Sequence, residues 1–215
     1  HMRADQDCLR LFHSTTFILT AQEARDLVAT FNDYYSRRGW QLHAPLPQRW
    51  YLTLSEAPEL ATSAPVNLAG RDISCGLPQG KDAPAWHAFL NEVQMLFHEH
   101  PVNLAREQRG EPAINSIWPW GGGHLPGRIS TTVSGVIAGH PQLRGLAQLG
   151  EVPCRDIPGN AVELMVESQR GLQLVWLDRL ERPWRYGEVE AWSEGISQLE
   201  QTWFRPLLDL LMQGR

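Results

Sequence analysis

The chain has 215 residues, of which 42% are hydrophobic and 20% are charged, and its net charge at pH 7 is −5. This composition supports a globular protein with a buried core, and it lacks the basic surplus typical of nucleic-acid-binding proteins. An apolar run of about 18 residues, which a membrane span needs, is absent, and so is a signal-peptide pattern. We therefore expect a cytoplasmic protein whose partners include neither nucleic acid nor membrane.

The N-terminal part predicts short strands followed by a helix. Apolar residues over 9–12 and 17–19 favour one or two strands. Thr20 and Glu23 have the spacing of a capping box, which predicts a helix that begins there and reaches about Arg37. A glycine two residues later is a typical helix end.

The rest of the first half predicts a hairpin, a loop and two helices. Strands are expected where apolar and polar residues alternate, helices where apolar residues recur every three or four positions, and a loop where prolines interrupt any periodicity. The expected elements are strands over 40–43 and 49–54, an ordered loop over 55–81, helices over 82–100 and 102–109, and an extended segment over 114–120.

The second half predicts strands that alternate with helices. Residues 172–177 form a compact apolar run that ends at Asp178, as in a parallel strand buried on both faces. Apolar residues then recur at helical spacing almost to the end of the chain, with Pro206 as a possible break. The expected elements are strands over 129–137, 152–157 and 172–177, and helices over 141–149, 162–167 and 189–211.

This order of elements predicts an α/β protein with a mixed α+β first half. We expect an α+β region over 3–125 and an α/β region over 126–213, packed as one compact unit. Three widely spaced cysteines indicate neither a disulfide framework nor a zinc site, so we expect reduced thiols. Nine tryptophans are too many for the surface. Four are expected in the core, namely Trp86, Trp176, Trp192 and Trp203.

The segment from His98 to Gly123 carries the most specific pattern in the chain. It contains His-Pro-Val-Asn, an arginine, Pro-Ala-Ile-Asn and then Ile-Trp-Pro-Trp-Gly-Gly-Gly. The rigid side chains of Trp118 and Trp120 thus precede three glycines, whose backbone is free to approach other groups closely. This pattern resembles the archaeal-type, cofactor-independent phosphoglycerate mutases. The likeness extends weakly over residues 40 to 213 and is specific only between about 70 and 126.

The resemblance implies an alkaline-phosphatase-like α/β core interrupted by an α+β insertion on the substrate side. It also implies two divalent metals and a nucleophilic serine or threonine, because phosphoryl transfer needs charge compensation. The chain has no stretch like the family's N-terminal metal and nucleophile region. Asp178 is followed by arginines rather than by the family's Gly-His, and positive charge there opposes a cation. We therefore expect no metal and no cofactor.

A second resemblance is closer. Arg49-Trp50-Tyr51, Leu77-Pro78-Gln79-Gly80 and Asn91-Glu92-Val93-Gln94-Met95 resemble a bacterial group of phosphoglycerate mutase-like proteins described as regulatory proteins of RpfE type. That resemblance implies regulation rather than a demonstrated reaction. Members of that group are usually longer at the N-terminus, so the chain is expected to begin inside a longer protein.

Several side chains are candidates for binding a small anion. Asn103 and Arg106 lie one helical turn apart, and such groups bind phosphate or carboxylate; the alternative is that they cap or brace the backbone. His98 and His100 diverge on a helix, which disfavours a metal pair. The candidate ligand-binding residues are Arg49, Arg71, Asp72, His100, Asn103, Arg106, Asn115, Trp118 and Trp120.

Three functions remain open from the sequence. The first is a non-catalytic mutase-like pseudoenzyme that acts as a regulatory module and binds a small anionic ligand or a protein partner. The second is a metal-dependent phosphoglycerate mutase or phosphatase whose catalytic half is missing from this chain. The third is a structural subunit that buries its tryptophan-rich surface against another protein.

Overall fold

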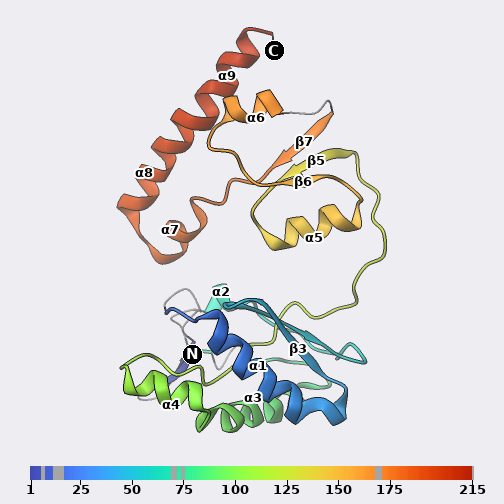
Figure 1. Ribbon diagram of the computed structural model, residues 1–215, viewed down its shortest axis with the longest axis vertical. Helices are drawn as coiled ribbons and strands as arrows, with labels where there is room; N and C mark the ends of the chain where they lie inside the picture. The colour runs from blue at the N-terminus through green and yellow to red at the C-terminus, as the bar shows by residue number, and fades with distance from the viewer. Residues whose placement is uncertain (6–7, 12–16, 69–71, 74–75, 168–170, 215) are drawn as a thin grey trace. The chain divides into compact units, whose positions relative to one another are not determined.

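The computed structural model describes residues 1–5, 8–11, 17–68, 72–73, 76–167 and 171–214. The chain divides into two compact units, His1–His124 (unit 1) and Leu125–Arg215 (unit 2). Both contain helices and small sheets (Figure 1), so the predicted mixed α/β class is confirmed.

Unit 1 begins with a short hairpin. Strand β1 (Met2–Asp5) pairs antiparallel with β2 (Cys8–Leu11). Of the one or two strands expected over 9–12 and 17–19, β2 confirms the first, whereas residues 17–19 form no regular element. Leu19 is nevertheless buried in the main core of unit 1, so its apolar character serves packing rather than pairing.

Helix α1 (Ala21–Tyr35) follows the predicted capping box. The Thr20 hydroxyl accepts a hydrogen bond from the Glu23 amide, and the Glu23 carboxylate accepts one from the Thr20 amide. A 3-10 turn (Ser36–Arg38) continues the helix and ends at Gly39, whose φ of 67° is left-handed. The prediction of this helix and both of its ends is confirmed.

The core of unit 1 lies between α1, a β-hairpin and a long helix. Strand β3 (Gln41–Leu46) pairs antiparallel with β4 (Arg49–Thr53), which confirms the predicted hairpin. Helix α3 (Ala83–His98) confirms the next prediction, although Asp82 does not cap it through its side chain. The fully buried core side chains on α1 and α3 include Leu27, Phe31, Phe89, Val93 and Phe97.

The rest of unit 1, where the structure describes it, is mostly irregular. A short helix α2 (Pro65–Leu68) interrupts the predicted loop, and Ala61 and Gln79 form an isolated antiparallel bridge across it. Helix α4 (Pro101–Gln108) confirms the second predicted helix. Residues 109–132 form neither helix nor strand.

Unit 2 is built on a three-stranded parallel sheet. Strand β5 (Val133–Ile137) lies in the middle, between β6 (Cys154–Arg155) and β7 (Leu172–Val175). Helix α5 (Pro141–Leu149) connects β5 to β6, and α6 (Ala161–Glu167) connects β6 to β7. Each of these elements was predicted, although the strands are shorter than expected.

Helices cover the sheet of unit 2 on both faces. Val136 and Ala138 pack against α5 through Ala147, whereas Ile137 points the other way, toward α6 and the C-terminal helices. Neighbouring residues on β5 thus enter two different cores, because side chains alternate along a strand. This is the arrangement of a doubly wound α/β sheet.

The prediction that residues 172–177 form a strand buried on both faces is wrong. Strand β7 lies at the edge of the sheet, and Leu172 and Leu174 are 59% and 39% exposed. Val175, on the other face of β7, packs against a core, as does Leu177 beyond the strand. The continuous apolar run made the strand look central, but apolar composition does not reveal which neighbours a strand has.

The C-terminal part is helical throughout. Helix α7 (Glu181–Tyr186), which the sequence did not indicate, precedes α8 (Val189–Leu199) and α9 (Arg205–Met212). A π-turn (Glu200–Phe204) joins the last two, and the Arg205 amide donates to the Glu200 carbonyl five residues earlier. The wider turn accommodates Pro206 without a break, so α8 and α9 continue in one direction (Figure 1).

The tryptophans divide differently from the prediction. Trp86 and Trp203 are buried, as expected, but Trp176 and Trp192 are 44% and 36% exposed. The expectation of core positions for the latter two is therefore wrong. Indole rings often lie at a surface with one side covered.

Candidate functional site

The segment from His98 to Gly123 carries the family resemblance and contains α4. Asn103, on α4, anchors the residues that follow this helix. The Asn103 side chain is fully buried. Its Nδ2 donates to the carbonyls of Phe97 and Ile114, at 2.8 and 2.9 Å, and its Oδ1 accepts from the Ile114 amide at 2.7 Å. The Asn103 amide group thus binds the backbone of both residues, and it holds Ile114 close to the end of α3.

Arg106, the next candidate on α4, is also buried, with 1% of its side chain exposed. Its Nε donates to the Pro112 carbonyl at 2.8 Å, and its Nη1 donates to the Ile18 carbonyl and to the Glu23 carboxylate, both at 3.1 Å. The guanidinium also lies over the Phe17 ring. The arginine therefore joins α1, α4 and the following loop from the inside.

Two carboxylates and a second arginine extend this arrangement to the surface. Glu23 and Glu111 each accept from Arg109 at 2.8 Å, and Glu111 also lies 3.4 Å from Arg106. Partial burial by itself raises the pKa of Glu23, but hydrogen bonds from Thr20 and the charge of Arg106 lower it overall. The charges of Arg106, Arg109, Glu23 and Glu111 balance within the cluster, although the buried Nη2 of Arg106 has no hydrogen-bond partner among the described residues.

Asn115 and Trp118 continue the same pattern further along the segment. The Asn115 side chain accepts from the Met2 amide at 2.9 Å and donates to the Met2 carbonyl at 2.7 Å, as a neighbouring strand would. The Trp118 indole donates to the Ser63 carbonyl at 2.8 Å and packs against a small core. Both side chains hold the segment against other parts of unit 1.

His100 is the N-cap of α4. Its Nδ1 accepts from the Val102 amide at 3.2 Å, so its Nε2 carries the proton and donates to the Thr30 hydroxyl at 2.9 Å. Burial lowers the pKa of His100, although the charge of Asp26 opposes this shift. Protonation of Nδ1 would also break the cap. The neutral ring thus links α4 to α1.

We expect the stability of unit 1 to fall as His100 becomes protonated. Since the folded-state pKa is depressed below 6.5, the stabilisation is complete above that value and declines as the pH falls through the folded-state pKa. The variant His100→Asn keeps a capping side chain and should show a shallower fall in melting temperature between about pH 7 and 5. The exposed His43→Asn is the control, and an unchanged slope in His100→Asn contradicts the assignment.

The other candidates that the structure describes are more exposed than Asn103 and Arg106. Arg49 is half-buried on β4, Asp72 is exposed, and Trp120 is 58% exposed at the start of the glycine turn. Arg71 lies outside the described residues. The structure thus brings together His100, Asn103 and Arg106 on α4, but as supports of the backbone.

A different group of side chains gathers in unit 2, at the carboxyl edge of the parallel sheet. His140 follows β5 and begins α5, while Trp176 and Asp178 follow β7. The rings of His140 and Trp176 lie 6.4 Å apart. Arg144, in the first turns of α5, pairs with Asp156 after β6. Sequence reasoning treated His140 as isolated, because only the parallel topology brings these strand ends together.

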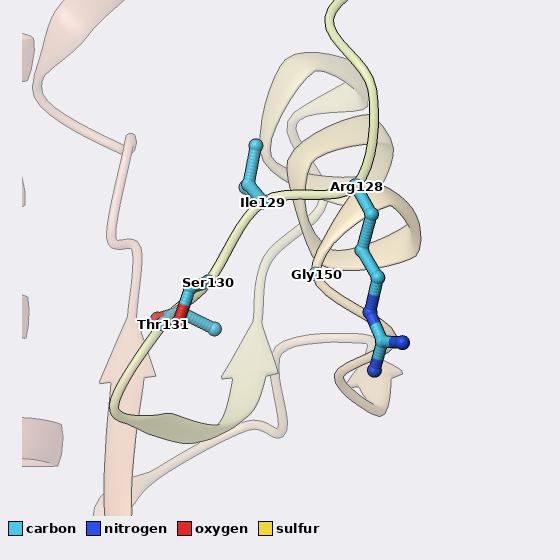
Figure 2. A pocket seen from close by; sticks show the side chains of 5 residues that line it. All are labelled: Arg128, Ile129, Ser130, Thr131 and Gly150. Atoms are coloured by element: carbon cyan, nitrogen blue, oxygen red, sulfur yellow. The ribbon is translucent and has the colours of Figure 1, made fainter.

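A pocket of about 330 Å³ lies in unit 2, and Figure 2 shows the side chains that line it. Arg128 is its only charged lining residue, and its guanidinium pairs with Glu151 at 2.8 Å. The remaining lining residues are Ile129, Ser130, Thr131 and Gly150. The pocket offers no cluster of titratable groups, so we do not place a reaction there.

Within the described part of the chain, no three His, Cys, Asp or Glu side chains lie close enough to hold a metal ion. Around Asp178, Arg179 donates to Gln198 at 2.7 Å and Arg182 lies 3.7 Å from Glu188. Arg179 and Arg182 thus have acceptors on α8 and directly before it. None of the described helices is both long enough and apolar enough to cross a membrane.

The homologues of this chain are archaeal-type 2,3-bisphosphoglycerate-independent phosphoglycerate mutases. It is 27% identical to that of Methanosarcina mazei over 110 residues, covering 50% of this chain and 28% of the relative. With the Methanothrix thermoacetophila protein the identity is 24% over 208 residues, covering 88% and 52%. The chain thus spans about half, or less, of the length of these relatives. No protein-family model matches it.

A solved structure of the same kind is similar. The cofactor-independent phosphoglycerate mutase from Thermoplasma acidophilum aligns with 20% identity and a TM-score of 0.37, covering 74% of this chain and 48% of that one.

Proposed function

We propose that this chain is a non-catalytic, phosphoglycerate mutase-like module with a regulatory or ligand-binding role, as in the RpfE-type group that it resembles. One observation supports this proposal most. The side chains of the mutase-like segment, Asn103, Arg106, Asn115 and Trp118, are used for hydrogen bonds to the chain's own backbone. The segment therefore works as a brace, and similarity to mutases there follows from a shared fold.

The arginines after Asp178 support the same proposal. Phosphoryl transfer requires positive charge near the transferred group, which divalent metals commonly supply. Here Asp178 is exposed and has Arg179 beside it. We infer that the alkaline-phosphatase-like core, which unit 2 would represent, has lost its metal site.

The test is metal binding and activity of the chain. We expect no conversion of 3-phosphoglycerate to 2-phosphoglycerate above the rate without protein, with or without Mn²⁺, and no rise in melting temperature on adding Mn²⁺ or Zn²⁺. The Methanothrix thermoacetophila protein serves as the positive control. Conversion by the chain, or a metal-dependent rise in its melting temperature, would overturn the proposal.

One observation favours an alternative, a metal-dependent mutase or phosphatase completed by sequence outside this chain. The chain covers only 28% to 52% of the two relatives compared above. In that case the missing half would supply both nucleophile and metal ligands. A metal-dependent activity that appears only in a longer protein containing this chain would support this alternative.

We place the ligand-binding surface at the carboxyl edge of the unit 2 sheet. Ligands of parallel α/β sheets bind at this edge, and the amino end of α5, which directly follows His140, favours an anion. Trp176 offers a partly exposed ring beside His140. His140 and Trp176 follow two adjacent strands, β5 and β7, unlike the braced residues of unit 1.

We expect 3-phosphoglycerate to bind this edge and His140→Ala to weaken binding about tenfold, through loss of a hydrogen bond to the anion. Trp176→Leu should weaken it as well. Isothermal titration calorimetry measures both, with Trp184→Leu, which is 76% exposed elsewhere in unit 2, as the matched control. Binding of equal strength in all variants, or none in the unaltered chain, refutes this site.

A further inference from the structure

The last helix of unit 2 carries an exposed apolar stripe. Phe204, which directly precedes α9, is 52% exposed, and Leu207, Leu208 and Leu211 on α9 are 37%, 57% and 70% exposed. Their spacing of three, four and seven residues places them on one side of the helix. We call these four residues the α9 stripe.

The α9 stripe is exposed although the helix itself packs against the rest of unit 2. Trp203, next to it in the chain, is 4% exposed and belongs to the core shared with α6. Helix α9 contacts α6 and continues directly from α8 (Figure 1). One side of the helix is thus covered by unit 2, while a second side presents large apolar groups to solvent. Contiguous surfaces of this kind mark interaction sites.

Two charged residues beside the α9 stripe indicate that its partner is a second copy of this chain. Arg205 and Asp209 lie one helical turn apart on the same flank of the stripe. When two identical helices pack antiparallel, each flank faces the same flank of the other copy. Arg205 of one copy then lies within one turn of Asp209 of the second copy, and the symmetry produces this pair twice. The charges on the flanks of two copies are therefore complementary.

We propose that the α9 stripe is a homodimer interface, in which the helix packs antiparallel against α9 of a second copy of this chain. Arg205 is available for this contact, because its own neighbour, Glu200, lies 4.0 Å away and both side chains are exposed. The antiparallel arrangement also aligns the helix dipoles favourably. The interface would cover four apolar side chains from each copy and leave the charges at its rim.

The first test is sedimentation of the chain over a concentration series. We expect a monomer–dimer equilibrium, and we expect Leu208→Glu and Leu211→Glu each to raise the dimer dissociation constant at least tenfold, roughly the effect of removing a central anchor. Met95→Glu is the matched control, because Met95 is 79% exposed on a helix of unit 1. Circular dichroism establishes that each variant is folded.

The second test exchanges the charges. Arg205→Glu makes the flank wholly acidic and Asp209→Arg makes it wholly basic, so each variant should dimerise less than the unaltered chain. An equimolar mixture should associate more tightly than either variant alone, because unlike flanks then face each other. The proposal is overturned if the unaltered chain is monomeric throughout, if the stripe variants behave like Met95→Glu, or if the mixture gains nothing.

Discussion

Replacing Arg106 by methionine should lower the free energy of unfolding by about 3–5 kcal/mol. The guanidinium is buried and donates to two backbone carbonyls, of Ile18 and Pro112, and to the Glu23 carboxylate. Methionine fills a similar volume but leaves these acceptors without a donor, and unsatisfied buried groups are costly. The loss should therefore be among the largest that a single substitution causes in unit 1.

Urea denaturation followed by circular dichroism measures this change, and hydrogen exchange localises it. Exchange should accelerate in peptides from α1 and α4, which Arg106 joins, and remain unchanged in unit 2. Arg109→Met is the matched control, because Arg109 contacts the same two carboxylates but is 48% exposed. Exposed ion pairs contribute little. Equal destabilisation by the two substitutions would show that burial does not determine the role of Arg106.

The low pKa of Glu23 adds a pH dependence to this cluster. Because the carboxylate is stabilised in the folded state, its contribution is present above its ordinary pKa of 4.5 and is lost as the pH falls through the lower folded-state value. Arg106 loses its charged acceptor when Glu23 is protonated. The cost of Arg106→Met should consequently be smaller in acid than at neutral pH.

Much of the fold could be predicted from local sequence. Helix α1 has both of its end signals in the chain itself, Thr20 with Glu23 at the start and a glycine after the end, and its boundaries were predicted within about two residues. Helix α5 was predicted over its full length, from Pro141 to Leu149. In each case the residues that determine where the helix begins and ends lie within a few positions of one another, so they can be recognised in the sequence.

What could not be predicted depends on contacts between distant residues. Strand β7 has the apolar composition of a central strand, yet it lies at the edge of the sheet, and Trp176 at its end is exposed for the same reason. The partners of Arg106 are separated from it by up to 88 residues. Nothing local distinguishes an arginine that binds an anion from one that braces a backbone.

The candidate site shows the same limit. Sequence reasoning considered both a ligand role and a structural role for Asn103, and a single pattern is compatible with either. In the structure, the polar atoms of Asn103 point at the backbone of Phe97 and Ile114. The mutase-like motif residues described above consequently have structural contacts in this segment. His140 and Trp176 belong to no family motif, but they lie at the carboxyl edge of the sheet, where parallel α/β sheets commonly bind ligands.

Asn103→Ala should therefore destabilise unit 1 by about 2–4 kcal/mol, without affecting ligand binding at the edge of the unit 2 sheet. The substitution leaves two carbonyls and the Ile114 amide without partners in a buried position. Asn67→Ala, on the exposed side of α2, should change the unfolding free energy by no more than about 0.5 kcal/mol.

Exchange of the Ile114 amide hydrogen is the most direct measurement of this brace, because that amide donates to Asn103 Oδ1 at 2.7 Å. In Asn103→Ala it should exchange much faster than in the unaltered chain or in Asn67→Ala. Asn103→Asp should also raise the exchange rate, because it cannot donate to the two carbonyls and so loosens the segment, but the rise should be smaller, since its carboxylate still accepts from Ile114. If the Ile114 amide stays protected in both variants, the segment is held by its apolar contacts, and the polar side chains of the motif are left free for another role.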